Sequence, residues 1–296
     1  QIWTINMEEN SKILVLGGAG HIGSNLIQEL SNNASFNEIY CLDDYSNGST
    51  NNHKIGCTYI KGDIANISEL VDFKVDTVVH LAEFARIEQS LSRYEHVVAN
   101  NIIGTLQVIQ FCIKNKCKLI YSASSAISSM TEPGIVNAPY TIAKQTNVEL
   151  IKSISSWEEL NHAIVYFYNV YGPGEKGHGP NATVVEKFLT HKLSNRAVTI
   201  TAPGTQRRNF THVHDIVDGL VKVIQKGSGD GYYIGNPKSY SIIELAQLMQ
   251  LPYDIGDTKL GNRSISQLDI QNMTQLGWRP KEQLEDYINK RLNRRS

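Results

Sequence analysis

The chain of 296 residues lacks a charge imbalance, cysteines at metal-binding spacing and long apolar runs. Its 28 Lys and Arg residues oppose 29 Asp and Glu residues, so the net charge of −1 predicts no general attraction to nucleic acid or anionic membranes. No apolar run approaches the ~18 residues of a membrane helix, and residues 1–11 are too polar for a signal peptide. We therefore expect a cytoplasmic protein with no nucleic-acid or membrane partner.

Cysteine is scarce, and its spacing indicates no metal site. The four cysteines form no C-x-x-C pair and have no neighbouring histidine cluster; they are Cys41, Cys57, Cys112 and Cys117. The five-residue separation of the last two is too loose for a zinc knuckle, so we expect reduced thiols and no bound metal. The hydrophobic fraction of 41% excludes disorder, and the length fits one large domain or two small ones.

The first half of the chain alternates short apolar runs with helical patterns. The strand-like runs cover residues 12–17, 38–42, 58–60, 77–81 and 118–122, and the helical patterns cover 21–30 and 97–113. Strands that alternate with helices form right-handed βαβ crossovers and a parallel sheet covered on both faces. This half therefore predicts a doubly wound α/β domain.

The pattern of apolar runs and helical segments changes after residue 172. Gly and Pro interrupt residues 172–180, which read GPGEKGHGP and indicate a loop. Shorter elements follow, with helices expected over 184–193, 216–225 and 242–250, a strand over 197–201 and a basic amphipathic helix over 282–295. These elements predict a second, smaller part of the molecule.

A glycine-rich turn lies between the first predicted strand and the first predicted helix. Residues 17–23 read GGAGHIG and contain G-x-G-x-x-G as Gly18, Gly20 and Gly23, and G-x-x-G-x-x-G when Gly17 is counted instead of Gly18. The glycines permit a tight turn, a close approach of the backbone to a pyrophosphate and close helix–strand packing. The helix N-terminus adds free N–H groups and a positive dipole. The turn predicts a dinucleotide cofactor.

An acidic residue follows the second predicted strand. Asp43 lies 20 residues beyond Gly23, the spacing at which a carboxylate binds the adenosine ribose hydroxyls. A carboxylate there repels a 2′-phosphate, which favours NAD over NADP. Asp44 competes for this role, and Asp43 has capping of the following turn as its alternative. Asp63, after the third strand, is placed to reach the adenine.

Three residues form a candidate catalytic group. Tyr140 and Lys144 are four residues apart, so they share one face of a helix that Pro139 is suited to begin. An ordinary phenol is a poor base at neutral pH, and a nearby ammonium favours its phenolate form. Y-x-x-x-K alone is common by chance. Its partner is Ser124, which follows the fifth predicted strand, where a parallel sheet presents residues to its ligand crevice.

With these motifs, the chain resembles the extended short-chain dehydrogenase/reductase family, in its nucleotide-sugar epimerase and dehydratase branch. The matching segments run in the family's order from residue 12 to residue 281: GGAGHIGSNL, LDDYSNGS, GDI, HLA, NNIIGT, YSASSA, PYTIAK, YNVYGPGE, RRNFTHVHD and LGWRPK. The resemblance implies a Rossmann-type doubly wound parallel sheet with a smaller α/β C-terminal substrate domain. The NAD-binding domain would cover 7–170 and be rejoined by about 197–225, and the nucleotide-sugar-binding domain would cover 171–196 and 226–296.

The resemblance also implies roles for individual residues. The catalytic residues would be Ser124, Tyr140 and Lys144. The residues that bind NAD would be Gly17, Gly20, His21, Ile22, Gly23, Asp43, Asp63, Ile64, Leu81, Ala82, Asn101, Tyr140 and Lys144. The residues that bind the substrate would be Ser124, Asn169, Arg208, Lys259 and Ser266. Arg207 is an alternative to Arg208 in binding the substrate phosphates, and Arg263 is an alternative to Lys259.

The residue at position 126 distinguishes between the branches of the family. Dehydratases have Thr-Asp-Glu where this chain has Ser124-Ser125-Ala126, decarboxylases keep that Glu, and 3,5-epimerases use Cys. The resemblance therefore implies 4-epimerisation of a UDP-sugar through a 4-keto intermediate, with Tyr140 as the base. The alternatives are an NAD(P)H-dependent 4-keto-sugar-nucleotide reductase and a catalytically silent NAD-binding regulatory protein.

Three departures from the family pattern bear on the substrate. Ile127-Ser128-Ser129 replaces V-Y-G, the stretch from Ser124 to Tyr140 is short, and residues 259–262 read KLGN where the family has R-x-G-D. Ser266 stands at a gate beside the sugar C2 substituent. Small residues there resemble enzymes that accept N-acetyl sugars, which suggests UDP-N-acetylglucosamine and UDP-N-acetylgalactosamine. Relatives pair helices across a two-fold axis, so a homodimer through the helix over 97–113 or the tail helix is expected.

Overall fold

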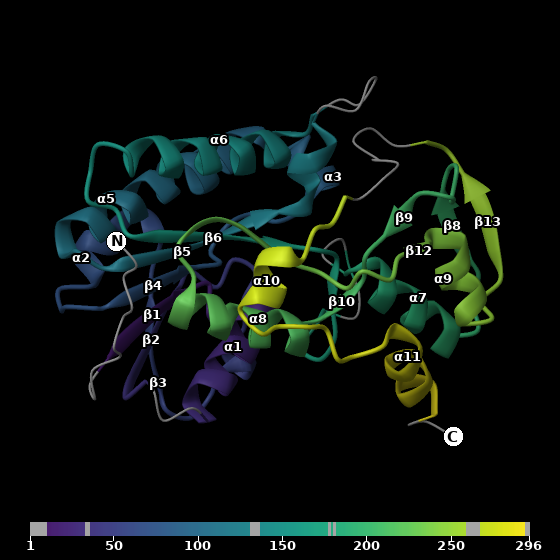
Figure 1. The fold of residues 1–296 in the computed structure, drawn as a ribbon. Coiled ribbons are helices and arrows are strands. Elements are labelled where there is room, and N and C mark those ends of the chain that lie inside the picture. The colour runs from purple at the N-terminus through teal and green to yellow at the C-terminus, as the bar shows by residue number, and fades with distance from the viewer. Residues whose placement is uncertain are drawn as a thin grey trace.

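The computed structural model describes residues 11–32, 36–130, 137–176, 179, 182–258 and 267–293. In this described part of the chain, seven parallel strands form a central sheet in the order β11-β6-β5-β4-β1-β2-β3 (Figure 1). The strands are β1 (Lys12–Leu16), β2 (Glu38–Asp43), β3 (Cys57–Lys61), β4 (Thr77–His80), β5 (Lys118–Ser124), β6 (His162–Phe167) and β11 (Gly229–Ile234). The order reverses between β1 and β4, and ligands bind at such a switch point.

Helices cover both faces of the sheet because alternate side chains of each strand point to opposite faces. From β1, Leu14 and Leu16 join one core with α5 (Thr105–Asn115) and α6 (Pro139–Ile154). Ile13 and Val15 join the other core with α1 (His21–Asn32) and α8 (Val213–Lys226). Figure 1 shows these two helix layers on opposite sides of the sheet. The predicted doubly wound α/β fold is confirmed.

The helix expected over 97–113 is longer and irregular. It runs as α4 (Tyr94–Val97), a π-helical segment η3 (Val98–Gly104) and then α5. Within the described residues, one helix is long and apolar enough to cross a membrane by length and composition, and it is this one, Tyr94–Asn115. Its α5 part buries Val108, Ile109 and Phe111 against the sheet. The wider π turn changes which side chains face the neighbouring elements.

A smaller unit follows and has a core of its own. It contains the pair β8 (Val198–Thr201) and β13 (Tyr253–Gly256), the pair β9 (Arg207–Arg208) and β12 (Tyr240–Ser241), and the helices α7 (Val184–Leu193), α9 (Ile242–Leu248) and α11 (Leu284–Asn293). Near this unit, β7 (Val170–Tyr171) pairs with β10 (Thr211–His212). The short elements are η1 (Thr50–Asn52), η2 (Ile64–Asn66), α2 (Ile67–Leu70), α3 (Ile87–Ser90), η4 (Ser125–Ser129) and α10 (Gln271–Gln275).

The structure corrects how the chain returns to the sheet. We expected residues 197–225 to rejoin the NAD-binding side, but β8 pairs with β13 in the smaller unit. Helix α8 does return and packs against α1. Strand β11 lies beyond the expected boundary at 226, yet it pairs with β6 in the large sheet. Its sequence, GDGYYI, contains turn-forming residues, which explains why the apolar pattern did not predict it.

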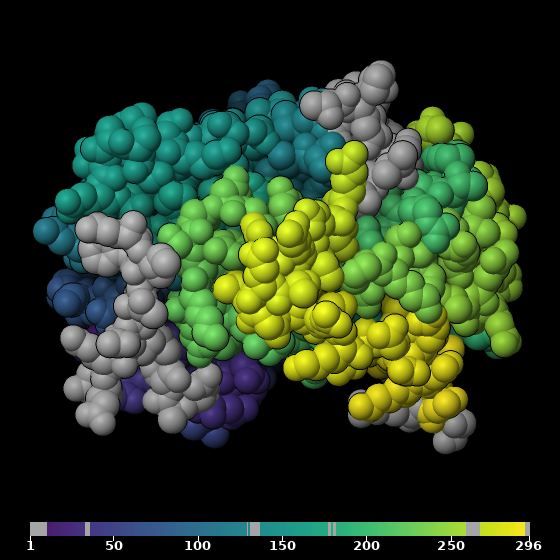
Figure 2. Space-filling view, in the orientation of Figure 1, coloured from purple at the N-terminus to yellow at the C-terminus, as the bar shows by residue number. Residues whose placement is uncertain are grey.

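The C-terminal segment joins the two parts. The Trp278 indole is fully buried and donates to the carbonyl oxygen of Asp215, in the first turn of α8, at 2.9 Å. The Asp215 carboxylate accepts the N–H groups of Lys281 at 2.9 Å and Glu282 at 3.0 Å. Figure 2 shows this segment, in yellow, crossing from the sheet side to the smaller unit. Segments of the two parts therefore alternate along the chain.

Candidate active site

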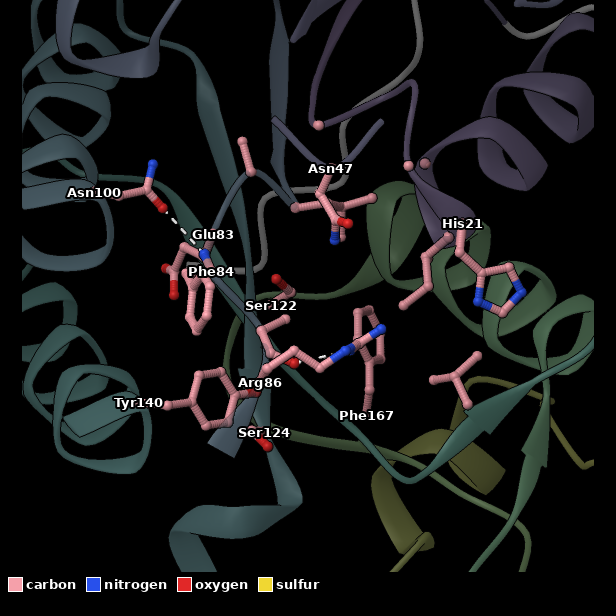
Figure 3. Close-up of a pocket in the computed structure, with 18 of the residues that line it drawn as sticks. His21, Asn47, Glu83, Phe84, Arg86, Asn100, Ser122, Ser124, Tyr140 and Phe167 are labelled. Carbon is pink, nitrogen blue, oxygen red and sulfur yellow. Dashed lines mark hydrogen bonds between the residues drawn. The ribbon is translucent and has the colours of Figure 1, made fainter. Parts of the chain in front are cut away.

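A cavity of about 500 Å³ opens at the carboxyl ends of the strands, where the sheet order reverses. It is lined by the β1–α1 turn, by the ends of β2, β4, β5 and β6, and by the first turns of α6 and α7 (Figure 3). Its volume is that of a ligand-binding cleft. The topology alone predicts a ligand site at this place.

In the glycine turn, close packing within the protein explains Gly17 and Gly23, whereas Gly20 leaves space for a ligand. Gly17 has φ +77°, and a Cβ there would lie 2.9 Å from the backbone of Leu81 and Ala82. A Cβ on Gly23 would lie 2.3 Å from the Gly17 oxygen. At Gly20 a Cβ would meet only that oxygen, at 3.3 Å, so packing there is less restrictive. The open backbone at the N-terminus of α1 fits a pyrophosphate.

Asp43 is buried beside this turn. Its Oδ2 accepts the Ala19 N–H at 2.9 Å and its Oδ1 accepts the Tyr45 N–H at 2.8 Å. Burial raises the pKa of this carboxyl. Each oxygen keeps a further lone pair, so the carboxylate can also accept ribose hydroxyls. The competing Asp44 lines the cavity too, but its Oδ1 accepts the Ser46 N–H at 2.8 Å.

Asp63 and the next residues predicted to bind the cofactor also line the cavity. The Asp63 carboxylate caps η2 by accepting the Ala65 N–H at 2.8 Å. His21 lines the cavity at the start of α1, and burial lowers its pKa to about 4, which keeps the ring neutral at neutral pH. The cavity is also lined by Ile22, Ile64, Leu81 and Ala82.

The structure brings the three candidate catalytic residues to one side of the cavity. Ser124 ends β5, and its Oγ accepts the Ala126 N–H at 3.2 Å, so the hydroxyl proton is left to donate elsewhere. Tyr140 lies in the first turn of α6 and Lys144 one turn later. Figure 3 shows the Tyr140 ring and Ser124 close together at the cavity wall.

A buried carboxylate that the sequence motifs missed contacts Lys144. The Lys144 Nζ lies 2.9 Å from the Glu83 Oε2 and also donates to the Ser122 carbonyl oxygen. Their side chains are only 5% and 2% exposed. The family motif HLA ends at Ala82, one residue before Glu83. A charged residue directly after a buried strand, at the ligand edge of the sheet, is the signal that would have found it.

The asparagine expected along the cofactor is not the one that lines the cavity. The Asn101 side chain is fully buried, accepts the Phe84 N–H at 2.9 Å and donates to the Phe84 carbonyl oxygen at 2.9 Å. Its neighbour Asn100 lines the cavity instead (Figure 3). The π segment η3 contains both residues, and its wider turn decides which one faces the ligand.

Only some of the residues predicted to bind the substrate line the cavity. Asn169 lines the cavity with φ +31°, a strained value for a residue other than glycine. Arg208 lies on β9 and is not part of the described cavity wall. The alternative Arg207 pairs with Glu244 at 3.1 Å. Lys259 and Ser266, with the alternative Arg263, lie outside the described residues.

Arg86 and Glu175 are further charged groups that the motifs did not predict. Arg86 lines the cavity, faces both Tyr140 and Glu175, and has its pKa lowered by burial. Glu175 lies in the loop after β7, where its Oε1 accepts the Gly172 N–H at 2.6 Å and its Oε2 accepts the Thr183 hydroxyl. Burial raises the Glu175 pKa from 4.5 to about 7. Glu175 therefore fastens this loop to the start of α7.

Three potential metal ligands gather outside the cavity. The ligand atoms of His212, His214 and Glu282 lie within 4.8 Å of one another. The His212 Nδ1, however, accepts the His214 N–H at 3.2 Å and so caps α8. Burial lowers the pKa of His212 to about 4. The capping bond accounts for this histidine without a metal ion, and the absence of a metal stays a prediction.

The fold and the site are matched by a known protein family. Residues 13–235 match the NAD dependent epimerase/dehydratase family. The chain therefore belongs to this family, within the extended short-chain dehydrogenase/reductases. It is an enzyme of the class that acts on nucleotide sugars, and its cofactor is NAD.

Relatives in this family catalyse different reactions. The chain is 27% identical over 302 residues to a putative UDP-glucose 4-epimerase of Methanocaldococcus jannaschii, covering 95% of this chain and 97% of the relative. It is 26% identical over 311 residues to UDP-glucuronic acid decarboxylase 3 of Arabidopsis thaliana, covering 94% and 87%. A solved Thermotoga maritima UDP-glucose 4-epimerase with UDP-glucose is 24% identical, with TM-score 0.85 and coverage of 96% and 99%. This structural likeness shows the shared fold.

We predict that Glu175 makes the fold less stable as pH rises. Because its pKa in the fold is about 7 and its ordinary value is 4.5, the folded chain retains a proton that the unfolded chain releases between these values. The free energy of unfolding should therefore fall across this interval. In Glu175→Gln, which stays neutral, that contribution disappears, and urea unfolding from pH 4 to pH 8, in roughly unit steps, measures it.

The matched control is Glu149→Gln, which changes an exposed carboxylate on α6 and should keep the wild-type slope. Parallel stability curves for the wild type and Glu175→Gln would contradict the assignment.

Proposed function

We propose that this chain is an NAD-dependent UDP-sugar 4-epimerase. The observation that carries the proposal is the cavity wall itself: Ser124, Tyr140 and Lys144 line it together, and alanine occupies position 126. The first three residues can exchange a proton with a sugar hydroxyl and stabilise the charge that this creates. The alanine offers no acid for a second reaction at the neighbouring carbon.

Each residue has one task in this reaction. The Ser124 hydroxyl donates a hydrogen bond to the oxygen at C4 of the sugar, and Tyr140 takes the proton of the C4 hydroxyl of the sugar. Lys144 holds positive charge near the phenolate. NAD, held by the glycine turn and Asp43, would supply a hydride acceptor at C4 and then a hydride donor for the opposite face of the sugar. The 4-keto sugar turns within the cavity and presents its other face, after which Tyr140 gives back the proton. The cofactor is thus retained rather than consumed.

The carboxylates of the described cavity wall support epimerisation over dehydration and decarboxylation. They belong to Asp43, Asp44, Asp63 and Glu83. The three aspartates accept main-chain N–H groups within or beside the turns after β2 and β3. The Glu83 carboxylate pairs with Lys144. Ala126 is buried, and its N–H group is bonded to Ser124. None of these four carboxylates replaces the acid that the other branches have at position 126.

Two other functions have less support. A 4-keto-sugar-nucleotide reductase would consume external NADPH, and the buried Asp43 carboxylate disfavours the 2′-phosphate of that cofactor. A catalytically silent regulatory protein would not need the three side chains that line the cavity together. For the sugar, we extend the proposal to UDP-N-acetylglucosamine and UDP-N-acetylgalactosamine on the small Ser266, with UDP-glucose and UDP-galactose as the alternative pair.

We predict that the purified protein carries NAD and interconverts C4 epimers without added cofactor. The test incubates it separately with UDP-glucose, UDP-N-acetylglucosamine and UDP-glucuronic acid, and follows the products by NMR. Absorbance and mass spectrometry of the denatured protein identify the bound cofactor. A strict requirement for added NADPH, or products that have lost water or carbon dioxide, would contradict the proposal.

Removal of the Tyr140 hydroxyl should abolish most of the activity. Tyr140→Phe keeps the ring in the first turn of α6 but cannot take the proton, so the turnover number should fall by about 10²- to 10⁴-fold. NAD should still copurify, because the glycine turn and Asp43 are unchanged. Tyr253→Phe, on β13 and away from the cavity, is the matched control. Full activity in Tyr140→Phe would exclude this residue as the base.

We also propose that the chain forms a homodimer through α4, η3 and α6. These elements pack side by side and expose large apolar side chains, with Tyr94 56%, Val98 46% and Ile142 45% exposed. A second copy would cover them. The tail helix α11, the other expected interface, instead buries Leu284 and Ile288 within the same chain. The apolar face of the tail helix is therefore already used.

Ile142→Lys should convert this dimer into a monomer, because it places a charge in the covered apolar face. Sedimentation velocity across a range of concentrations measures the change. Ile55→Lys is the control, since Ile55 is 97% exposed on a different part of the chain and should leave the dimer intact. A wild-type protein that sediments as a monomer at every concentration would exclude the proposed interface.

A further inference from the structure

The ion pair beneath the catalytic group is held by more than its two charges. The Glu83 Oε1 accepts the Thr105 hydroxyl at 3.1 Å and the Asn147 amide at 3.3 Å, while its Oε2 faces the Lys144 Nζ at 2.9 Å. Asn147 also donates to the Asn101 carbonyl oxygen at 2.6 Å. Side chains from α5 and α6 thus fix the carboxylate of the β4 edge in one position.

Lys144 is the charge that balances this carboxylate. The neighbouring His80 lies 3.8 Å from the Glu83 Oε1, but full burial lowers its pKa to about 4, so its ring is neutral at neutral pH. His80 Nε2 instead contacts the Thr105 hydroxyl at 2.9 Å. Glu83 and Lys144 therefore form a pair whose opposite charges lie next to the cavity.

A buried ion pair is a costly way to fill a core, because desolvation of both charges offsets their attraction. Well-packed apolar residues of similar size often serve the fold equally well. The position of this pair, directly against a residue of the catalytic group, therefore points to a role in the reaction rather than in stability alone.

The pairing limits what Lys144 can offer to the cavity. An ammonium has three N–H donors, and here one faces Glu83 and another bonds to the Ser122 carbonyl oxygen. One donor remains for a ligand. The carboxylate also reduces the positive potential that Lys144 creates at Tyr140, because the field of an ion pair falls off faster with distance than that of a single charge.

We propose that Glu83 is a positioning residue that fixes the Lys144 ammonium and offsets its charge at Tyr140, so that the enzyme needs a higher pH for full activity than Lys144 alone would require. The proposal rests on the proposed function in one respect, the role of Tyr140 as the base. Its sign follows from electrostatics: a positive charge without its counter-ion favours the phenolate more strongly.

Two other titratable groups interact electrostatically with Tyr140: Arg86, between β4 and α3, and Tyr121, on β5. Arg93 and His96, before and within α4, line the same cavity, and His80, on β4, lies beside Glu83. The arginines stay charged throughout the working range, His80 stays neutral, and burial raises the pKa of Tyr121 well above its ordinary value. The Glu83 carboxylate raises the pKa of both His80 and Tyr121, so its removal lowers both. His80 then stays neutral, and subtraction of the Tyr140→Phe protein in the same background removes the Tyr121 contribution.

The decisive variant is Glu83→Gln, which keeps the shape and the acceptor for Thr105 and Asn147 but removes the charge. The acid limb of its pH–rate profile should lie about one pH unit below that of the wild type. A second readout needs no substrate: the ultraviolet absorbance of the Tyr140 phenolate, obtained by subtracting the Tyr140→Phe protein in each background, should appear at correspondingly lower pH.

The control is Thr105→Val, which removes one hydrogen bond to Glu83 and keeps its charge. It should leave the acid limb in place, and an equal shift in this variant would assign the effect to lost structure and overturn the proposal. In Glu83→Gln, a limb that stays in place or moves to higher pH overturns it as well. Should that variant not fold, Glu83→Asp withdraws the carboxylate from Lys144 and must shift the limb in the same direction by less.

Failure of the proposed function is distinguishable from failure of this inference. If no UDP-sugar is epimerised, the phenolate titration still reports whether Glu83 controls the charge state of Tyr140. If epimerisation occurs and the titration is the same with and without the Glu83 carboxylate, the inference alone is overturned.

Discussion

The rest of the structure depends on the close approach of the β1–α1 turn to the end of β4. Gly17 lies so near Leu81 and Ala82 that no side chain fits, and its N–H group bonds to the Leu42 carbonyl oxygen of β2 at 2.9 Å. Three neighbouring strands are thereby held with their carboxyl ends together. The cavity, the open N-terminus of α1 and the position of Asp43 all follow from this contact.

Charge is handled locally in this molecule. In this nearly neutral chain, each acidic group of the site has a local partner. Asp43 accepts backbone N–H groups, Glu83 pairs with Lys144, and Glu175 accepts the Gly172 N–H and the Thr183 hydroxyl. Burial lowers the pKa of His21 and raises the pKa of Glu175. Phosphate groups of a ligand would therefore be bound by a few placed donors, and a basic surface is not needed.

The two parts of the molecule are built by an interleaved chain. Helix α8 and strand β11 return to the large sheet after the first elements of the smaller unit, and the C-terminal segment then crosses back through Trp278 and Asp215. This route places Asn169, just before β7, and the start of α7 beside the carboxyl ends of the strands. The cavity is consequently enclosed by residues that are far apart in the sequence.

The sequence by itself determined the elements whose cause is local. Short apolar runs predicted β1 to β5, the glycine spacing predicted the turn at α1, and the i, i+4 spacing placed Tyr140 and Lys144 on one helix face. The helix over 184–193 was predicted with the bounds that the structure has. These features depend on periodicity and turn chemistry, which a few neighbouring residues carry.

Only the tertiary structure decided the features that need distant partners. The turn-like sequence of β11 becomes a strand because β6 offers its open edge, and β8 finds β13 instead of the large sheet. Asn100 rather than Asn101 faces the cavity because of a π turn. Glu83 meets Lys144 because β4 ends close to where α6 begins. Such contacts are set by packing between elements that are far apart in the sequence, so a local pattern can mark a residue such as Glu83 but does not specify its partner.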